Sequence, residues 1–373
     1  MILLKFLFLS CHTGEGHNSA AEAVISSLKH RSCEANIVDP VSFIGEHTKK
    51  TVSGFYNDLI KVSPSSFGRI YRIGEWYSSS RLPSPIYLAN SVYSGKLRDY
   101  ILSEHYDAVV STHLFGMEAM TALESHFGKL VPSFGVLTDY TVIPFLNEIS
   151  LDTCFVPHDS IGRAMSNDKL PPERIVATGI PVDPEFALKI SKEDARKELG
   201  IETDKRIILV MTGGVGCGHP KKICEHFIES GIKDTELYVM VGKNEKLKKS
   251  IDDDYSQTGI IHTVSFTKKV NLYMKSSDLL ISKAGGLSTT EAAASNIPLI
   301  HLRPIPGCEL ENARFFEKLG MSVWASNELD AVSKADSLLN DPKRMQNMER
   351  RQADIINPHA ADDIADYVIN YGK

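Results

Sequence analysis

Twelve short apolar runs recur along the chain, and segments with helical periodicity separate them. Strands that are buried on both faces look like this, and helices cover both faces of such parallel sheets. Because six runs fall in each half, we predict an α/β chain with two doubly wound, Rossmann-like sheets. The runs lie at 2–9, 35–39, 107–112, 134–137, 153–156 and 175–178, then at 206–211, 236–241, 260–264, 279–282, 299–302 and 322–324.

The chain is also long enough for two domains, because 373 residues exceed what one core usually serves. The segment from Gly179 to Pro184 holds two prolines, which disfavour helix and sheet, so we predict the linker there. This gives an N-terminal domain over 1–185 and a C-terminal domain over 186–355. Open sheets bind ligands at the carboxyl ends of their strands, so we expect a cleft between the domains that takes two substrates.

Composition excludes several classes of function. The net charge of -6 gives no general case for a nucleic-acid partner. The six cysteines form no Cys-x-x-Cys pair and the 13 histidines no His-x-x-x-His pair, so we expect neither a metal nor a disulfide framework, and a cytoplasmic location. Lys5 interrupts the apolar opening run, which favours a buried strand over a signal peptide, and no stretch approaches the roughly 20 apolar residues of a membrane span.

The stretch 49–104 lacks the alternation of apolar runs and helical segments found in the rest of the chain. It has no strand signal, eight basic against four acidic residues, and nine of the chain's 30 aromatic residues. Basic residues among amphipathic aromatics suit an anionic membrane surface. An ordinary helical insert, whose aromatics pack between helices and sheet, fits the same composition.

Both halves begin with a strand that runs into glycines. Gly14 and Gly16 follow the first run, and Gly213, Gly214 and Gly216 follow the seventh. Glycine lets the backbone approach a phosphate closely, and a following helix start offers free N–H groups, so both loops are candidates for a diphosphate. Neither loop matches the common ATP or NAD motif. After the first loop, Ser19 and Glu22 predict a capping box at the start of a helix.

His17 stands at the end of the first loop, and we place it just before that helix. A histidine there can take a proton from a hydroxyl group, because its pKa lies near neutral pH, although a structural or merely exposed histidine fits equally. Asp139 and His113 each follow a strand at the same sheet edge. They are candidates to orient His17 or the acceptor, or simply to cap a nearby turn.

In the second half, the turn at Gly285 and Gly286 joins a buried strand to an alanine-rich helix. Ser288 and Glu291 fit a capping box. Alternatively, Glu291 accepts hydrogen bonds from a ribose while the glycine turn leaves room for a nucleotide. The next loop carries polar groups that suit sugar hydroxyls, or it is only a turn.

Six motifs together carry a family resemblance: Gly14 to His17, Thr138-Asp139, Thr178 to Pro181, Gly213 to Gly218, Lys283 to Gly286 with Glu291, and Ile305 to Gly307 with Glu309 and Asn312. These motifs occur in the order typical of one family, so the chain resembles the monogalactosyldiacylglycerol synthase and processive diacylglycerol glucosyltransferase group of glycosyltransferase family 28. The resemblance implies a GT-B fold and inversion at the anomeric carbon without a metal or cofactor. It also implies a UDP-sugar donor at the C-terminal domain, a lipid acceptor at the N-terminal domain, a peripheral place on the membrane, and a last segment, 356–373, whose helix crosses back.

The resemblance also implies roles for single residues. His17 matches the general base, with Asp139 beside it as the second catalytic residue, and Glu291 matches the ribose-binding acid. The donor contacts would come from Gly14, Gly16, Gly213, Gly214, Gly216, Lys283, Gly285, Gly286, Ser288, Gly307, Glu309 and Asn312. Two departures matter: Cys308 stands where the family usually has Gln, which leaves the sugar open, and His219 stands where a Met-Gly-Pro run is usual.

Three alternatives remain at this point. The first is a family 28 enzyme with a polyprenyl-linked or soluble natural-product acceptor. The second is a UDP-sugar epimerase on the same fold, and the third is a protein that binds a UDP-sugar without turnover.

Overall fold

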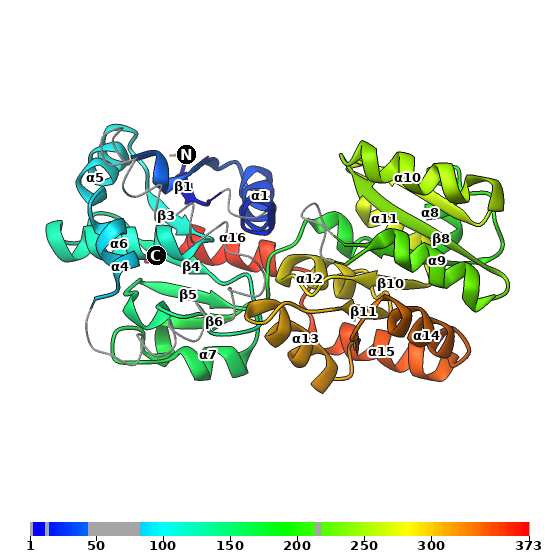
Figure 1. Cartoon of the computed structure of the whole chain (residues 1–373). Coiled ribbons are helices and arrows are strands. Elements are labelled where there is room, and N and C mark those ends of the chain that lie inside the picture. The colour runs from blue at the N-terminus through cyan, green and yellow to red at the C-terminus, as the bar shows by residue number, and fades with distance from the viewer. Residues whose placement is uncertain (1–2, 12–14, 44–82, 213–217, 373) are drawn as a thin grey trace. The chain divides into compact units, whose positions relative to one another are not determined.

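The computed structural model describes residues 3–11, 15–43, 83–212 and 218–372 (Figure 1). The chain forms two compact units. The first unit comprises Met1–Pro184, Pro306–Cys308 and Asn357–Lys373. The second comprises Glu185–Ile305 and Glu309–Ile356.

Each unit is built on a parallel sheet of six strands, which confirms the predicted α/β fold. The first sheet has the order β2-β1-β3-β4-β5-β6 and the second the order β12-β11-β10-β7-β8-β9. The strands of the first are β1 (Lys5–Leu9), β2 (Glu34–Val38), β3 (Ala108–Ser111), β4 (Ser133–Val136), β5 (Thr153–Val156) and β6 (Ile175–Ala177). Those of the second are β7 (Arg206–Met211), β8 (Thr235–Gly242), β9 (Ile261–Ser265), β10 (Leu279–Ser282), β11 (Leu299–Leu302) and β12 (Val323–Ala325).

The strand order reverses direction between β1 and β3 in the first sheet and between β7 and β10 in the second. Loops that leave two such neighbours diverge to opposite sides of the sheet and open a crevice at its carboxyl edge. The loops after these four strands hold most of the residues that the sequence singles out, so this topology decides where a site can form in each unit.

Helices cover both faces of each sheet. The first unit contains α1 (Glu15–His30), α4 (Pro85–Ser91), α5 (Ser94–Ser103), α6 (Leu114–Phe127), α7 (Asp159–Met165) and α16 (Ala360–Asn370). The second contains α8 (Lys192–Leu199), α9 (Pro220–Ser230), α10 (Glu245–Tyr255), α11 (Val270–Ser276), α12 (Gly286–Ala294), α14 (Glu328–Leu339) and α15 (Pro342–Ile355). Helix α13 (Cys308–Lys318) begins at the return to the second unit.

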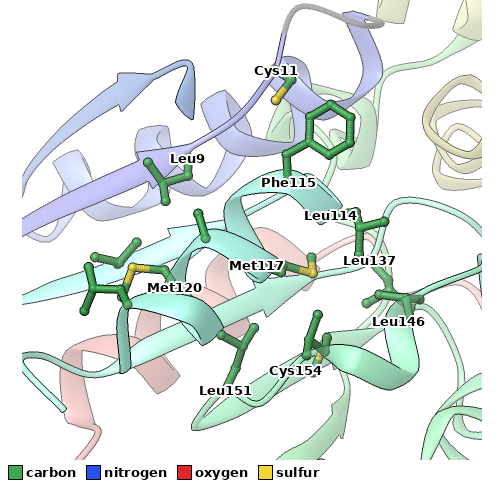
Figure 2. Packing of buried hydrophobic residues seen from close by; sticks show 14 of the residues in the cluster. Leu9, Cys11, Leu114, Phe115, Met117, Met120, Leu137, Leu146, Leu151 and Cys154 are labelled. Atoms are coloured by element: carbon green, nitrogen blue, oxygen red, sulfur yellow. The ribbon is translucent and has the colours of Figure 1, made fainter. Parts of the chain in front are cut away.

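Alternation along β1 divides the first unit's core into two layers. Phe6 and Phe8 belong to the cluster that includes α1 and α16, whereas Leu7 and Leu9 belong to the cluster under α6. Figure 2 shows part of the second cluster, with Leu9 near the α6 side chains. Helix α6 approaches β1 closely because Gly116 has no side chain: a Cβ there would lie 2.7 Å from Leu9 Cβ. Burying a leucine of this kind contributes about 2 kcal/mol.

Helix α16, from the far end of the chain, belongs to the first unit and packs on α1. Its apolar residues Ala361, Ile364, Ala365 and Val368 join the cluster around Phe6 and Phe8. At the rim, Arg31 Nη1 lies 2.9 Å from Asp362 Oδ1 and Arg31 Nε 2.6 Å from Asp366 Oδ1.

Only part of the stretch 49–104 lies within the described residues, because 44–82 falls outside them. In the described part, Tyr93 is fully buried and donates a hydrogen bond from its hydroxyl to Asn90 Oδ1 at 2.7 Å. By contrast, Leu88 is 54% exposed and Val92 is 64% exposed. This part therefore combines packing aromatics with exposed aliphatic side chains. None of the helices within the described residues has both the length and the apolar character needed to cross a bilayer.

Candidate active site

His17 lies inside helix α1, because the helix begins at Glu15. The prediction that it stands in the loop before the helix is wrong, and so is the capping box of Ser19 and Glu22, which lie within the helix. The Ser10 hydroxyl, just after β1, donates to Asn18 Oδ1 at 2.6 Å and so ties the beginning of α1 to the end of the strand.

Two threonines hold the His17 ring at its Nδ1 atom. The Thr112 carbonyl oxygen lies 2.8 Å from Nδ1, and Thr138 Oγ1 lies 2.9 Å from the same atom. A carbonyl can only accept, so we assign the proton to Nδ1, which donates to Thr112. The lone pair of the neutral ring is then on Nε2. His17 is therefore set up as a base at Nε2.

Burial lowers the pKa of His17 below its ordinary value of 6.5, while the charge of Asp139 and the Thr112 contact pull it back upward. The ring is accordingly neutral near pH 7 and able to accept a proton. The Asp139 carboxylate is thus near enough for its charge to act on His17, and both residues line the same pocket. This carboxylate favours the imidazolium that forms when His17 takes a proton.

Beside His17 the first unit has a small pocket of about 30 Å³, which is enough for a group the size of a water molecule. It can admit a hydroxyl group next to the base. His17, Thr112, Thr138, Asp139 and Thr141 line it together with Leu114, Met117, Val136, Leu137, Ile143 and Leu146.

His113 lies next to His17, with ring centroids 4.7 Å apart and planes at 84°. Its Nδ1 accepts a hydrogen bond from the Phe115 backbone N–H at 3.2 Å and so caps helix α6. Burial and the neighbouring His17 hold the pKa of His113 well below 6.5. Of the two readings of His113 from the sequence, the structure favours the cap.

In the second unit, helix α12 begins at Gly286, with Gly285 as its N-cap in an extended conformation. Ser288 therefore lies in the first turn and Glu291 one turn further on, so the predicted capping box is wrong. Gly285 has no side chain, so the N-cap residue itself makes no capping hydrogen bond to this helix start. Its first N–H groups, with the positive end of the helix dipole, can therefore bind an anion such as a phosphate.

Three predicted donor residues come together beside this helix start. Lys283 Nζ lies 3.4 Å from Glu309 Oε1, and Glu309 Oε2 accepts from the Ile305 backbone N–H at 3.3 Å. Asn312, fully buried, donates from Nδ2 to the Ala284 carbonyl at 3.0 Å. These contacts fix the start of α13 against the loop that follows β10.

The second glycine loop is described only at its end, because Gly213, Gly214 and Gly216 lie outside the described residues, as does Gly14. Gly218 has φ +90, and a Cβ there would lie 2.8 Å from Leu302 Cδ2, so only glycine fits. Gly16 lies in α1, and Gly307 has φ +113, also a conformation that favours glycine.

Glu328, at the start of α14, holds the end of the same loop. Its Oε1 accepts from the His219 backbone N–H at 3.0 Å and lies 3.4 Å from Arg303 Nη1. His219 is the exposed N-cap of α9, and its side chain makes no capping hydrogen bond. The sequence gives no signal for Glu328, because the contact joins residues 109 positions apart. Among the described residues, no three His, Cys, Asp or Glu side chains gather as metal ligands would.

Two family models match the chain and together cover most of it. Residues 17–182 match the model described as monogalactosyldiacylglycerol (MGDG) synthase. Residues 217–366 match the glycosyltransferase family 28 C-terminal domain.

Relatives and solved structures give the same picture. A processive diacylglycerol beta-glucosyltransferase of Bacillus cereus (strain AH187) is 27% identical over 98% of this chain and 93% of that protein. One from Bacillus anthracis (strain A0248) matches to the same extent. The fold is shared with S. aureus MnaA bound to UDP (TM-score 0.64, 16% identity, 99% of this chain and 97% of that one). It is also shared with Acinetobacter baumannii MurG (TM-score 0.62, 14% identity, 99% of both chains).

The His17 geometry predicts an unusual titration. We expect the His17 pKa to lie below 6.5 and Nδ1 to carry the proton in the neutral ring. Asp139→Asn removes the charge that raises this pKa, so the pKa should fall further. Nitrogen-15 NMR of histidine-labelled protein, with the His17 signal assigned by its loss in His17→Ala, measures both quantities. A pKa at or above 6.5, or a neutral ring protonated on Nε2, would contradict the assignment.

Proposed function

We propose that this chain, which belongs to glycosyltransferase family 28 and to its monogalactosyldiacylglycerol synthase group, transfers a hexose from a UDP-sugar to a diacylglycerol-type lipid. The chain is a UDP-sugar-dependent glycosyltransferase with the two-domain GT-B fold. The proposal concerns the donor sugar, the lipid acceptor, the inverting reaction and the membrane surface at which it takes place.

The His17 site carries the proposal. The Thr112 carbonyl directs the basic lone pair to Nε2, and the adjoining pocket has room for a hydroxyl group. This arrangement lies in the part of the chain that matches the MGDG synthase model. An acceptor hydroxyl that enters the pocket would meet a neutral base whose protonated form Asp139 favours.

The reaction that follows is a single displacement. His17 Nε2 takes the proton of the acceptor hydroxyl as its oxygen attacks the anomeric carbon of the UDP-hexose. The bond from that carbon to the diphosphate oxygen breaks, and UDP leaves with the bonding electron pair. Attack opposite the leaving group inverts the anomeric configuration. General-base help of this kind contributes about 10²- to 10⁴-fold in rate.

Residues of the second unit would hold the donor. The uncapped start of α12 offers backbone N–H groups to the diphosphate, and Lys283 adds a positive charge beside it. Glu309 and Asn312 support the sugar, and Glu291 binds the ribose. In this proposal the helix start and the lysine stabilise the leaving UDP, so the chemistry needs no metal ion.

We propose that the first unit contacts the membrane surface. Leu88 and Val92 are more than half exposed on and just after α4, and Lys96 and Arg98 follow on α5. Exposed aliphatic side chains that are close in sequence to basic ones favour an anionic lipid surface, where the proposed acceptor also lies.

The central test is turnover with a lipid acceptor. Purified protein with anionic vesicles that contain diacylglycerol and a panel of UDP-hexoses should release UDP and form a glycolipid in equal amounts. His17→Ala should lower this rate about 10²- to 10⁴-fold, because the general base is lost. UDP release and glycolipid are measured together, with and without EDTA, and EDTA should not change the rate.

The outcomes separate the alternatives. UDP binding without turnover on any lipid would refute the diacylglycerol acceptor and favour another acceptor or a sensor. A changed sugar nucleotide formed from the donor alone would favour an epimerase. A His17→Ala variant that retains the full rate would refute the assignment of the base.

Glu291 should act on donor binding. We expect Glu291→Gln to raise the KM for the UDP-sugar at least tenfold with a smaller change in kcat, because a hydrogen bond to a charged group contributes about 1.5 to 3 kcal/mol. Glu311→Gln, on α13, is the matched control and should leave KM unchanged. Initial rates over a range of UDP-sugar concentrations decide the point, and an unchanged KM in Glu291→Gln would exclude the ribose role.

Val92 should contribute to membrane binding. Val92→Glu places a negative charge where an apolar side chain would enter the lipid interface, so a smaller fraction of protein should sediment with anionic vesicles. Leu329→Glu is the control, since Leu329 is similarly exposed, at 58%, but lies on α14 of the second unit. Equal losses in the two variants would count against a specific membrane surface on the first unit.

A further inference from the structure

A second pocket, of about 720 Å³, lies in the second unit away from the proposed donor residues. Arg206 begins β7, Asp278 immediately precedes β10 and Pro298 immediately precedes β11. The pocket therefore lies at the amino ends of these parallel strands, whereas the donor residues follow their carboxyl ends. A volume of several hundred Å³ is typical of sites for small molecules.

The pocket is lined by more basic than acidic side chains. Four basic side chains, Lys189, Lys192, Arg206 and Lys275, line it together with Asp278 and Glu349, and apolar side chains such as Ile190 and Ile297 complete the walls. In a chain of net charge -6, this is a local excess of positive charge.

Most of these charges are already satisfied within the fold. Asp278 pairs with Lys192 and Arg196 and accepts from the Ile207 backbone N–H at 2.8 Å. Arg206 donates to the Leu339 carbonyl at 2.9 Å. These groups hold α8 and α14 to the start of β7, so they build the walls of the pocket.

Lys275 and Glu349 are different. Lys275 Nζ reaches only the Ser295 carbonyl, at 3.4 Å, and within the described residues no carboxylate lies within 4.0 Å of it. Glu349 makes no hydrogen bond or ion pair there either. Both side chains are partly buried. Burial lowers the pKa of Lys275 and raises that of Glu349, which the charge of Lys192 lowers in part and that of Asp278 raises further.

We propose that this pocket binds a small hydroxylated anion of the sugar-phosphate class, with the phosphate on Lys275 and a sugar hydroxyl donating to Glu349. A phosphate supplies the negative charge that Lys275 lacks, and Asp278 opposes it weakly because Lys192 and Arg196 neutralise Asp278. The pocket is far larger than a free phosphate, and its apolar walls suit the carbon face of a sugar ring.

An unpaired, partly buried charge costs folding stability, so it is typical of a group kept for binding. Lys275→Met keeps the aliphatic stem and removes the ammonium. We expect this variant to be at least as stable to heat as the native chain while it binds the sugar phosphate at least tenfold more weakly. A purely structural lysine would give the opposite pattern, with lower stability.

The test is calorimetric titration of the full chain with glucose 6-phosphate in the presence of saturating UDP. UDP occupies the proposed donor site, so any remaining binding reports on the second pocket. Inorganic phosphate and glucose, titrated separately, should each bind more weakly than the joined molecule. Glu349→Gln should also weaken binding, and Lys343→Met, at an exposed lysine of α15 that does not line this pocket, is the matched control.

Saturable binding that is weakened by Lys275→Met and Glu349→Gln but not by Lys343→Met would support the site. No binding, or equal weakening in all three variants, would overturn it. A separate titration with UDP alone tests the donor site, so failure of one site is not confused with failure of the other. If Lys275→Met does not fold, Glu349→Gln still decides the question.

Discussion

Parallel pairing of buried strands is the constraint on which both units depend. It places all carboxyl ends of a sheet at one edge and forces each connection to run back through a helix. In the first unit, β1 pairs with β3, so the end of β3 lies beside the end of β1, the strand that precedes α1 in sequence. The Thr112 carbonyl can therefore reach His17, 95 residues away in sequence. A shift in that pairing would remove the contact that fixes the imidazole.

Parallel pairing also explains why the two units present different chemical groups at the same edge of similar sheets. In the first, a helix start and two strand ends surround a histidine whose buried ring stays neutral. In the second, the corresponding edge carries an uncapped helix start and a lysine beside it. One edge thus favours accepting a proton and the other favours holding an anion. The proposed transfer requires these two properties, and similar sheets supply both because only their loop residues differ.

The sequence predicts the fold well because buried parallel strands have a strong local signal: each of the twelve apolar runs overlaps a strand. The first residues of the helices are harder to predict from the sequence. Both predicted capping boxes are wrong, because Ser19 lies inside α1 and Ser288 lies inside α12 rather than at the N-cap. His17 and Asp139 could be singled out by their place after a strand. The protonation of His17 could not, because it depends on contacts from β3 and β4 that no local pattern encodes.

The position of α16 has a consequence for how the chain folds during synthesis. The face of the first sheet formed by Phe6 and Phe8 is completed by Ile364 and Val368, which follow the second unit in the sequence and therefore leave the ribosome after it. Most of the second unit, Glu185–Ile305 and Glu309–Ile356, is synthesised before them. The N-terminal unit, although begun first, can therefore close its core only after the C-terminal one has been made. Until then its apolar face stays open to water and to other chains.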